Sequence, residues 1–249
     1  MVQTWLYALI SVFLVSLISL IGVFSLPFDR KYLKNVLIYF ISFSAGALFG
    51  DTFIHLLPEV ARKGELSLDV SLYILVGIGS FFLIEKIICW RHCHLPITKN
   101  HIHRFAYMNL FGDSIHNFID GLIIGATYLT GFSVGIATTI AIVLHEIPQE
   151  IGDFGVLLHG GFTRRKAIFL NFLTALTAVL GTFCALFLNS YIKDLNSFLI
   201  PFAAGSFIYI AGSDLIPELH KETETRRNVI QFISFVAGIL IMFSLLALG

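Results

Sequence analysis

Long apolar stretches, broken by short polar segments, constrain this chain more than any other feature. Eight of them follow one another, at residues 4–27, 36–57, 70–88, 106–130, 133–158, 167–190, 197–217 and 229–248. A helix needs about 20 apolar residues to cross ~30 Å of hydrocarbon, and each stretch is long enough. The runs are continuous and not alternating, which favours helices over membrane β-strands. The sequence therefore predicts an all-α, polytopic membrane protein with eight transmembrane helices.

Composition agrees with a membrane protein and excludes several other classes. Hydrophobic residues make up 57% of the 249 residues and charged residues only 13%, with a formal net charge of zero. A soluble domain usually carries about 25% charged residues. We therefore exclude an ordinary soluble enzyme, a nucleic-acid-binding protein and a disordered chain. The loops are too short for a separate soluble domain, so we expect one transmembrane domain over residues 1–249.

Basic residues predict how the helices are oriented. Thirteen Lys and Arg residues lie in or beside the loops after the first, third, fifth and seventh stretches, and three lie in the other loops. Because cytoplasmic loops carry the excess of basic residues, we expect the first set in the cytoplasm and both termini outside. A basic cluster follows the first stretch, which favours a retained span over a cleavable signal peptide. A bacterial inner membrane, a plasma membrane and an organelle membrane are all compatible with this pattern.

Two segments of the chain resemble one another. Residues 40–59 and 199–218 align at an offset of 159, with identities at Phe43/Phe202, Ala45/Ala204, Gly46/Gly205, Leu56/Leu215, Pro58/Pro217 and Glu59/Glu218. The two spans cross the membrane in opposite directions, so we interpret the pair as an inverted repeat in a 3+2+3 arrangement. Such repeats are typical of secondary transporters, whose sites lie near the midplane. His55 and Asp214 would then be symmetry mates at the outer and inner mouths.

Candidate metal ligands concentrate in the fourth and fifth stretches. They are His116, Asn117, Asp120, His145, Glu146, Gln149 and Glu150. Residues four apart share a helix face, so His116 pairs with Asp120 and His145 with Gln149. Both faces lie near the expected midplane, on antiparallel neighbours. The sequence therefore predicts that the two polar faces meet inside the membrane.

The charge pattern of this region predicts a bound cation. No Lys or Arg occurs between Phe105 and Thr163, although five carboxylates do. One buried carboxylate at the centre of a span costs about 2.5–3.5 kcal/mol. The missing counter-charge must come from solvent, and imidazole with carboxylate suits zinc and similar divalent ions. The region could hold one ion, or two that share Asp120. Pro148 adds a break in the helix, because it frees the carbonyl of Leu144.

Polar residues on either side suggest a path for a cation. They are Asp51 and His55 toward the outside, and Asp113, Asp153 and Asp214 toward the inside. The expected cytoplasmic loop after the third stretch, residues 89–104, holds six further candidates for metal capture: Cys89, His92, Cys93, His94, His101 and His103. Their spacing fits no closed zinc site, so an exposed polar loop is the alternative.

The motif pair HNFIDG and HEIPQEIGD resembles the ZIP (Zrt- and Irt-like) family of metal transporters. It most resembles the branch whose fifth span reads H-E-x-P-H-E, and GDTFIHLLPE and PFAAGSFIYIAGSDLIPE are further matches. The resemblance implies a carrier that moves zinc, and often iron, manganese or cadmium, into the cytoplasm. It implies a first site of His116, Asp120, His145 and Gln149, and a second of Asn117, Asp120, Glu146 and Gln149. Gln149 departs from the family's His or Glu and is a weaker ligand.

Two other functions stay open at this point. A membrane-embedded zinc hydrolase is suggested by His145-Glu146-x-x-Gln149, although Gln149 replaces the second His of H-E-x-x-H. A metal-sensing receptor is suggested by the loop 89–104 alone. We expect a carrier and not an enzyme, with Zn²⁺ (alternatively Fe²⁺, Mn²⁺ or Cd²⁺) as substrate and no cofactor. Its expected partners are divalent metal ions and the lipid bilayer, with no nucleic acid, and a homodimer is one possible assembly.

Overall fold

The computed structural model describes residues 2–21, 30–63, 67–89, 104–192 and 194–248. Helices are the only regular structure in these ranges. They are α1 (Val2–Ile18), α3 (Arg30–Asp51), α4 (Leu57–Lys63), α5 (Leu68–Cys89), α6 (Arg104–Thr130), α7 (Phe132–His159), α8 (Arg164–Ala175), α9 (Thr177–Leu188), α10 (Leu195–Tyr209), α11 (Ile216–Leu219) and α12 (Thr225–Leu245). The expectation of an all-α chain is therefore confirmed for this part of the protein.

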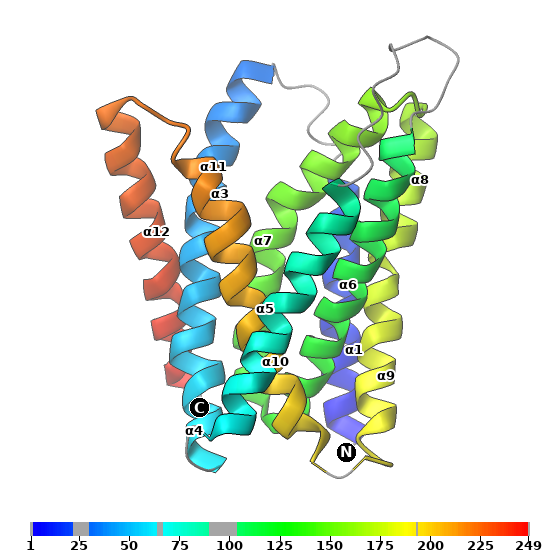
Figure 1. Ribbon diagram of the computed structural model, residues 1–249, viewed down its shortest axis with the longest axis vertical. Coiled ribbons are helices and arrows are strands. Elements are labelled where there is room, and N and C mark those ends of the chain that lie inside the picture. Colours follow the sequence, from blue (N-terminus) through cyan, green and yellow to red (C-terminus); the bar gives the residue numbers. More distant parts are fainter. Residues whose placement is uncertain (1, 22–29, 64–66, 90–103, 193, 249) are drawn as a thin grey trace.

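The long helices form one bundle, in which α1 begins and α12 ends at the same end (Figure 1). Seven segments of the described chain are long and apolar enough to cross a membrane: Val2–Ile21, Leu37–Arg62, Leu68–Lys86, Phe132–Leu158, Arg164–Leu188, Leu195–Leu219 and Thr225–Leu245. They correspond to seven of the eight expected spans. The eighth expected span, 106–130, is occupied by α6, a helix of 27 residues that carries the polar residues of the HNFIDG motif.

Helix boundaries differ from the expected spans mainly at their ends. The second helix begins at Arg30 and reaches Lys63, because charged residues extend a helix past its apolar part without breaking it. The sixth expected span is divided at Leu176 into α8 and α9. The turn expected at residues 130–133 is confirmed and is very short, since only Gly131 separates α6 from α7.

Two helices carry a π-helical turn at equivalent places. Thr52–Leu56 lies between α3 and α4, and Ile210–Leu215 lies between α10 and α11. In each, the N–H of the residue before a proline donates to the carbonyl five positions back. Pro58 and Pro217 have no N–H, so the α-helical ladder cannot continue through either position. The last residues of the two turns, Leu56 and Leu215, are related by the offset of 159 that relates the repeated segments.

Glycines bring the backbones of α3 and α12 into contact. A Cβ added to Gly46 would lie 2.0 Å from Phe235 O, and one added to Gly238 would lie 2.1 Å from Phe43 O. No side chain fits at these separations, so each helix contributes a glycine where the other helix approaches. This close pairing holds α3 against α12.

A second helix pair, α5 with α10, repeats this arrangement. A Cβ at Gly205 would lie 2.0 Å from Ile74 O, and one at Gly77 would lie 2.2 Å from Phe202 O. Gly205 and Phe202 are the residues that align with the glycine and phenylalanine of α3 in the repeated segments. The same packing device therefore recurs in the two halves of the chain.

Helices α6 and α7 lie side by side in the bundle. α6 is held against α9, because a Cβ at Gly121 would lie 1.8 Å from Ala178 O and one at Gly181 would lie 2.0 Å from Phe118 O. α7 contacts α6, α3 and α1. The facing sides of α6 and α7 are thereby kept away from the lipid-facing surface.

Candidate metal centre

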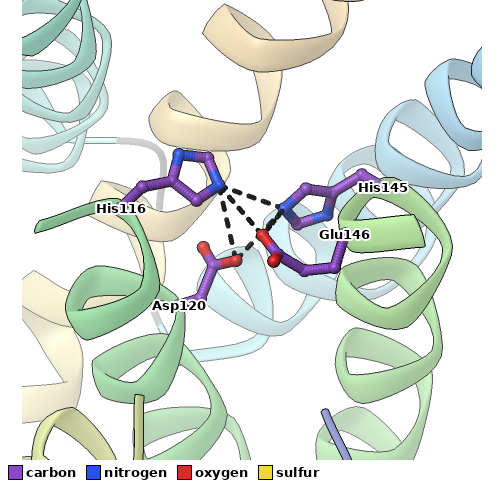
Figure 2. A group of neighbouring side chains, drawn as sticks. All are labelled: His116, Asp120, His145 and Glu146. Atoms are coloured by element: carbon purple, nitrogen blue, oxygen red, sulfur yellow. Dashed lines mark hydrogen bonds and ion pairs between the residues drawn. The ribbon is translucent and has the colours of Figure 1, made fainter. Parts of the chain in front are cut away.

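Four buried side chains from α6 and α7 converge halfway along these helices (Figure 2). His116 and Asp120 come from α6, and His145 and Glu146 come from α7. His116 is 9% exposed and the other three are each 1% exposed. One donor atom from each residue lies within 4.8 Å of the other three. We call these four residues the α6–α7 cluster.

The distances between donor atoms in the α6–α7 cluster suit tetrahedral coordination of a metal ion. The two Nε2 atoms of His116 and His145 lie 3.3 Å apart. Asp120 Oδ2 lies 3.1 Å from His145 Nε2 and 3.6 Å from His116 Nε2, and Glu146 Oε1 lies 3.4 and 3.3 Å from them. Zinc binds nitrogen and oxygen at about 2.0–2.2 Å, and a tetrahedron with such bonds has edges of roughly 3.3–3.6 Å. Five of the six edges of this group of four atoms therefore suit one zinc ion, and the sixth, between Asp120 and Glu146, lies within 4.8 Å.

The ring of His145 is oriented for binding through Nε2. Its Nδ1 lies 3.2 Å from Ala141 O, one turn earlier in α7. A proton on Nδ1 forms this hydrogen bond and leaves the lone pair of Nε2 directed at the cluster, which is the usual arrangement of a metal-binding histidine. The rings of His116 and Phe81 pack in a T-shaped arrangement, with ring centroids 5.3 Å apart.

A divalent cation would also satisfy the charge of the cluster. Asp120 Oδ1 and Glu146 Oε1 have no hydrogen-bond partner among the described residues. No Lys or Arg lies in the sequence between Phe105 and Thr163 to neutralise them. Two ionised carboxylates with two neutral imidazoles carry a charge that one divalent ion cancels.

A cavity of about 160 Å³ reaches the cluster from one end of the bundle. It is lined by Phe81, Ile84, Glu85, Asn109, Gly112, Asp113, His116, Gln149, Asp153 and Asp214. Asn109 donates from Nδ2 to Asp153 Oδ1 at 2.9 Å, and the Tyr209 hydroxyl donates to Glu85. The three aspartates that the sequence places on the inner side therefore share one cavity. Asn109 and Tyr209 were not anticipated, because a single polar residue in an apolar stretch gives no pattern.

A second cavity, of about 290 Å³, lies at the opposite end. His55 and the turn between α6 and α7 line it, and none of the four cluster residues does. Beneath His55 lies Asp51, which is fully buried. Asp51 accepts a hydrogen bond from Thr138 Oγ1 of α7 at 2.8 Å and lies 3.2 Å from His55 Nδ1. His55 and Asp214 thus line cavities at opposite ends, as the repeat predicts.

Three other candidate ligands have different neighbours. Asn117 donates from Nδ2 to Asp113 Oδ1 at 2.8 Å. Glu150 accepts a hydrogen bond from Asn171 Nδ2 in α8. Gln149 lines the cavity beside His116, and Glu146 joins both histidines. The first ligand set that the resemblance implies, which combines the histidines with Gln149, stays a prediction.

The loop proposed for metal capture falls largely outside the described residues. Cys89 is the last residue of α5. The other five candidates, His92, Cys93, His94, His101 and His103, lie in the range 90–103 and outside the described part of the chain.

Comparison with known proteins finds similarity along nearly the whole chain. The profile of the ZIP zinc transporter family matches residues 2–104 and 91–246. Zinc transporter ZIP13 of Pongo abelii is 32% identical, over 96% of this chain and 78% of its own length. Zinc transporter zipt-7.2 of Caenorhabditis elegans is 29% identical over 97% of this chain, which spans 65% of that protein's length. Zinc transporter SLC39A7 of Mus musculus is 27% identical, over 97% of this chain and 69% of its own length. This chain belongs to the ZIP zinc transporter family.

Proposed function

We propose that this protein carries divalent cations, chiefly zinc, into the cytoplasm through the α6–α7 cluster. The observation that carries the proposal is that five of the six separations among the four buried donors are 3.1–3.6 Å, which suits the tetrahedral coordination of one ion. The relatives described above are named as zinc transporters, which supports zinc as the substrate.

The donor set favours zinc and first-row transition ions over calcium and magnesium. Calcium and magnesium prefer oxygen ligands alone, whereas two imidazole nitrogens with two carboxylate oxygens suit zinc, iron and manganese. Four donors at the corners of one tetrahedron favour a single ion at this level. The neutral amide of Gln149 would meet the ion as it leaves toward the cavity, and would hold it weakly.

The proposed topology has eight membrane crossings, with both termini outside. Seven apolar segments and α6 supply the crossings, and an even number agrees with α1 beginning and α12 ending at one end of the bundle (Figure 1). The excess of basic residues in alternate loops supports the orientation. The matching π turns and glycine contacts support two inverted halves, with α6 and α7 between them.

The proposed path follows the two cavities. An ion enters the cavity lined by His55, passes Asp51, binds the cluster, and leaves through the cavity lined by Asp113, Asp153 and Asp214. In the structure the inner cavity reaches His116, whereas the outer cavity contains no cluster residue. This asymmetry suits a carrier that opens the site to one side at a time, in its inward-open state.

The position of Glu146 disfavours the hydrolase alternative. A catalytic zinc keeps one coordination position open for water, and in H-E-x-x-H the glutamate acts as a base and does not bind the metal. Glu146 instead lies 3.3 and 3.4 Å from the two histidine Nε2 atoms, at the fourth corner of the tetrahedron.

Zinc uptake into metal-free proteoliposomes tests the proposal. Wild type should accumulate zinc, and His145→Ala and Asp120→Ala should abolish uptake, because each removes one of four donors. His220→Ala and Asp69→Ala are matched controls on exposed residues and should transport as wild type does. A wild type that moves no zinc, iron, manganese or cadmium would overturn the carrier. Normal uptake by the two cluster variants would overturn the assigned site.

A further inference from the structure

Pro148 leaves one carbonyl of α7 without its helical donor, directly beside the cluster. Proline lacks an N–H, so the carbonyl four residues earlier, that of Leu144, cannot receive its usual bond. Leu144 immediately precedes His145 and Glu146 in α7. Inside a membrane protein, a carbonyl without a donor must find another partner or draw in water. How this carbonyl is satisfied therefore bears on where the two ligands lie.

Ser44 of α3 supplies the missing donor. Its hydroxyl oxygen lies 2.5 Å from Leu144 O, across 100 residues of sequence, and the side chain is fully buried. The same oxygen lies 2.7 Å from Phe40 O, one turn earlier in α3. A hydroxyl has one hydrogen for these two acceptors. Phe40 O already has a helical donor and Leu144 O has lost its own, so the hydrogen stabilises the structure more at Leu144.

We propose that Ser44 is a positioning residue for the metal cluster: its hydroxyl replaces the N–H that Pro148 lacks and fixes the turn of α7 that presents His145 and Glu146. The inference rests on the proposed function, since it takes the cluster as the cation site. Metal geometry tolerates displacements of only a few tenths of an ångström. A small rotation of this turn is therefore enough to weaken binding, although Ser44 hydrogen-bonds to Phe40 O and Leu144 O and to no residue of the cluster.

The hydroxyl also provides a bond that can be released. Among the described side chains, two hydrogen bonds join α3 to α7: Ser44 to Leu144 O, and Thr138 to Asp51. Any movement of α7 along α3 must break both. Phe40 O lies within reach of Ser44, so the serine keeps an acceptor when the helices separate. An apolar residue at position 44 would have no hydrogen to donate to either carbonyl.

Equilibrium zinc binding in detergent, by competition with a fluorescent chelator, tests the proposal in a double-mutant cycle. Ser44→Ala should weaken zinc affinity by about tenfold, because it leaves a buried carbonyl without a donor. Ser44→Thr, which keeps the hydroxyl, should retain affinity to within about threefold. The matched control is Ser42→Ala, which removes a buried hydroxyl of α3 that donates to Gln231 O in α12 at 2.6 Å. This control should change affinity by less than about twofold.

Pro148→Ala supplies the decisive background. The restored N–H can bond Leu144 O, so adding Ser44→Ala to Pro148→Ala should change affinity by less than about twofold. Unchanged affinity in Ser44→Ala alone, or an equal loss in both backgrounds, would refute the role of Ser44. A Ser44→Ala protein that folds only when combined with Pro148→Ala would support it.

Failure of this inference and failure of the proposed function have different signatures. If wild type binds and transports zinc but the cycle shows no coupling, the inference about Ser44 fails alone. If wild type binds zinc without moving it into liposomes, the proposal of a carrier fails. The coupling between Ser44→Ala and Pro148→Ala in zinc affinity still decides the role of Ser44. The thermal unfolding midpoints of the metal-free proteins give the same cycle without any ion.

Discussion

Asn171 of α8 donates from its side-chain amide to the carboxylate of Glu150 in α7, across 2.5 Å. The same amide lies within 3.4 Å of Glu150 O and 3.3 Å of Ser19 O. This contact holds Glu150 toward α8, whereas Glu146, one turn earlier, faces α6. Two glutamates that look equivalent in the sequence therefore have different neighbours.

We expect Glu146→Gln and Glu150→Gln to differ strongly in zinc binding. Glu146→Gln replaces a charged donor of the cluster with a neutral one, and affinity should fall at least about tenfold. Glu150→Gln keeps an oxygen that accepts from Asn171, and affinity should stay within about threefold of wild type. Competition titrations in detergent measure both. A larger loss for Glu150→Gln would place that residue among the ligands.

Zinc should stabilise the folded protein through the cluster. A ligand that binds only the folded state at 100 times its Kd adds about 2.7 kcal/mol to the free energy of unfolding. The thermal unfolding midpoint of wild type should therefore rise when zinc is added and fall back when a chelator removes it. Asp120→Asn should lose most of this shift, while Asp69→Asn on the exposed start of α5 keeps it. An equal shift in both variants would locate the stabilising ion elsewhere.

The contact between α5 and α10 should not tolerate a methyl group. A Cβ at Gly77 would lie 2.2 Å from Phe202 O, so Gly77→Ala should lower the free energy of unfolding by about 1–3 kcal/mol. Gly79, on the same helix, has nothing within 4 Å of an added Cβ, which makes Gly79→Ala a matched control. Thermal unfolding in detergent compares the two. Equal midpoints would mean that the helices do not approach this closely.

His55→Ala should slow uptake without weakening equilibrium binding. His55 lines the cavity opposite to the one that reaches His116, so its loss affects the proposed entry path and leaves the cluster intact. We expect uptake at low zinc to fall by at least about threefold, with zinc affinity within about twofold of wild type. Initial rates in proteoliposomes and titrations in detergent separate the two effects. A parallel loss of affinity would assign His55 to the binding site itself.

Gln149→His should create a second zinc site. Gln149 shares its cavity with His116, Asp113 and Asp153, so an imidazole there would join donors already present. We expect bound zinc to rise from about one to about two ions per chain, as metal analysis after dialysis would measure. Gln3→His, on the exposed start of α1, is the control and should stay at one. No increase in Gln149→His would mean that these donors cannot converge on a second ion.

Much of the helical architecture follows from the apolar stretches alone. A run such as 133–158 is too long and too continuous for anything except a membrane helix, and α7 occupies it almost to the residue. Gly131 is the only turn signal between α6 and α7, and it was sufficient to predict the turn that separates them. The π turns were not foreseen, although their signal was present: Pro58 and Pro217 stand at equivalent places in the repeated segments.

The candidate site was predictable where spacing decides it. The spacing of four residues brings His116 and Asp120 to one face, and the absence of basic residues indicated what that face requires. The neighbours of Asn117 and Glu150 were not predictable, because they depend on Asp113 and on Asn171 in another helix. Ser44 gave no signal at all, since one hydroxyl in an apolar helix belongs to no pattern.

The two π turns confine the effect of a one-residue deletion to the turn itself. A π turn accommodates one residue more than an α-helix of equal length. Deleting one residue from Thr52–Leu56 or Ile210–Leu215 would convert the π turn into an α-helical turn, so the helix beyond it would keep its length and its orientation. Since His55 and Asp214 lie within these turns, such a deletion would leave the rest of the helix in place and displace a residue that lines a cavity.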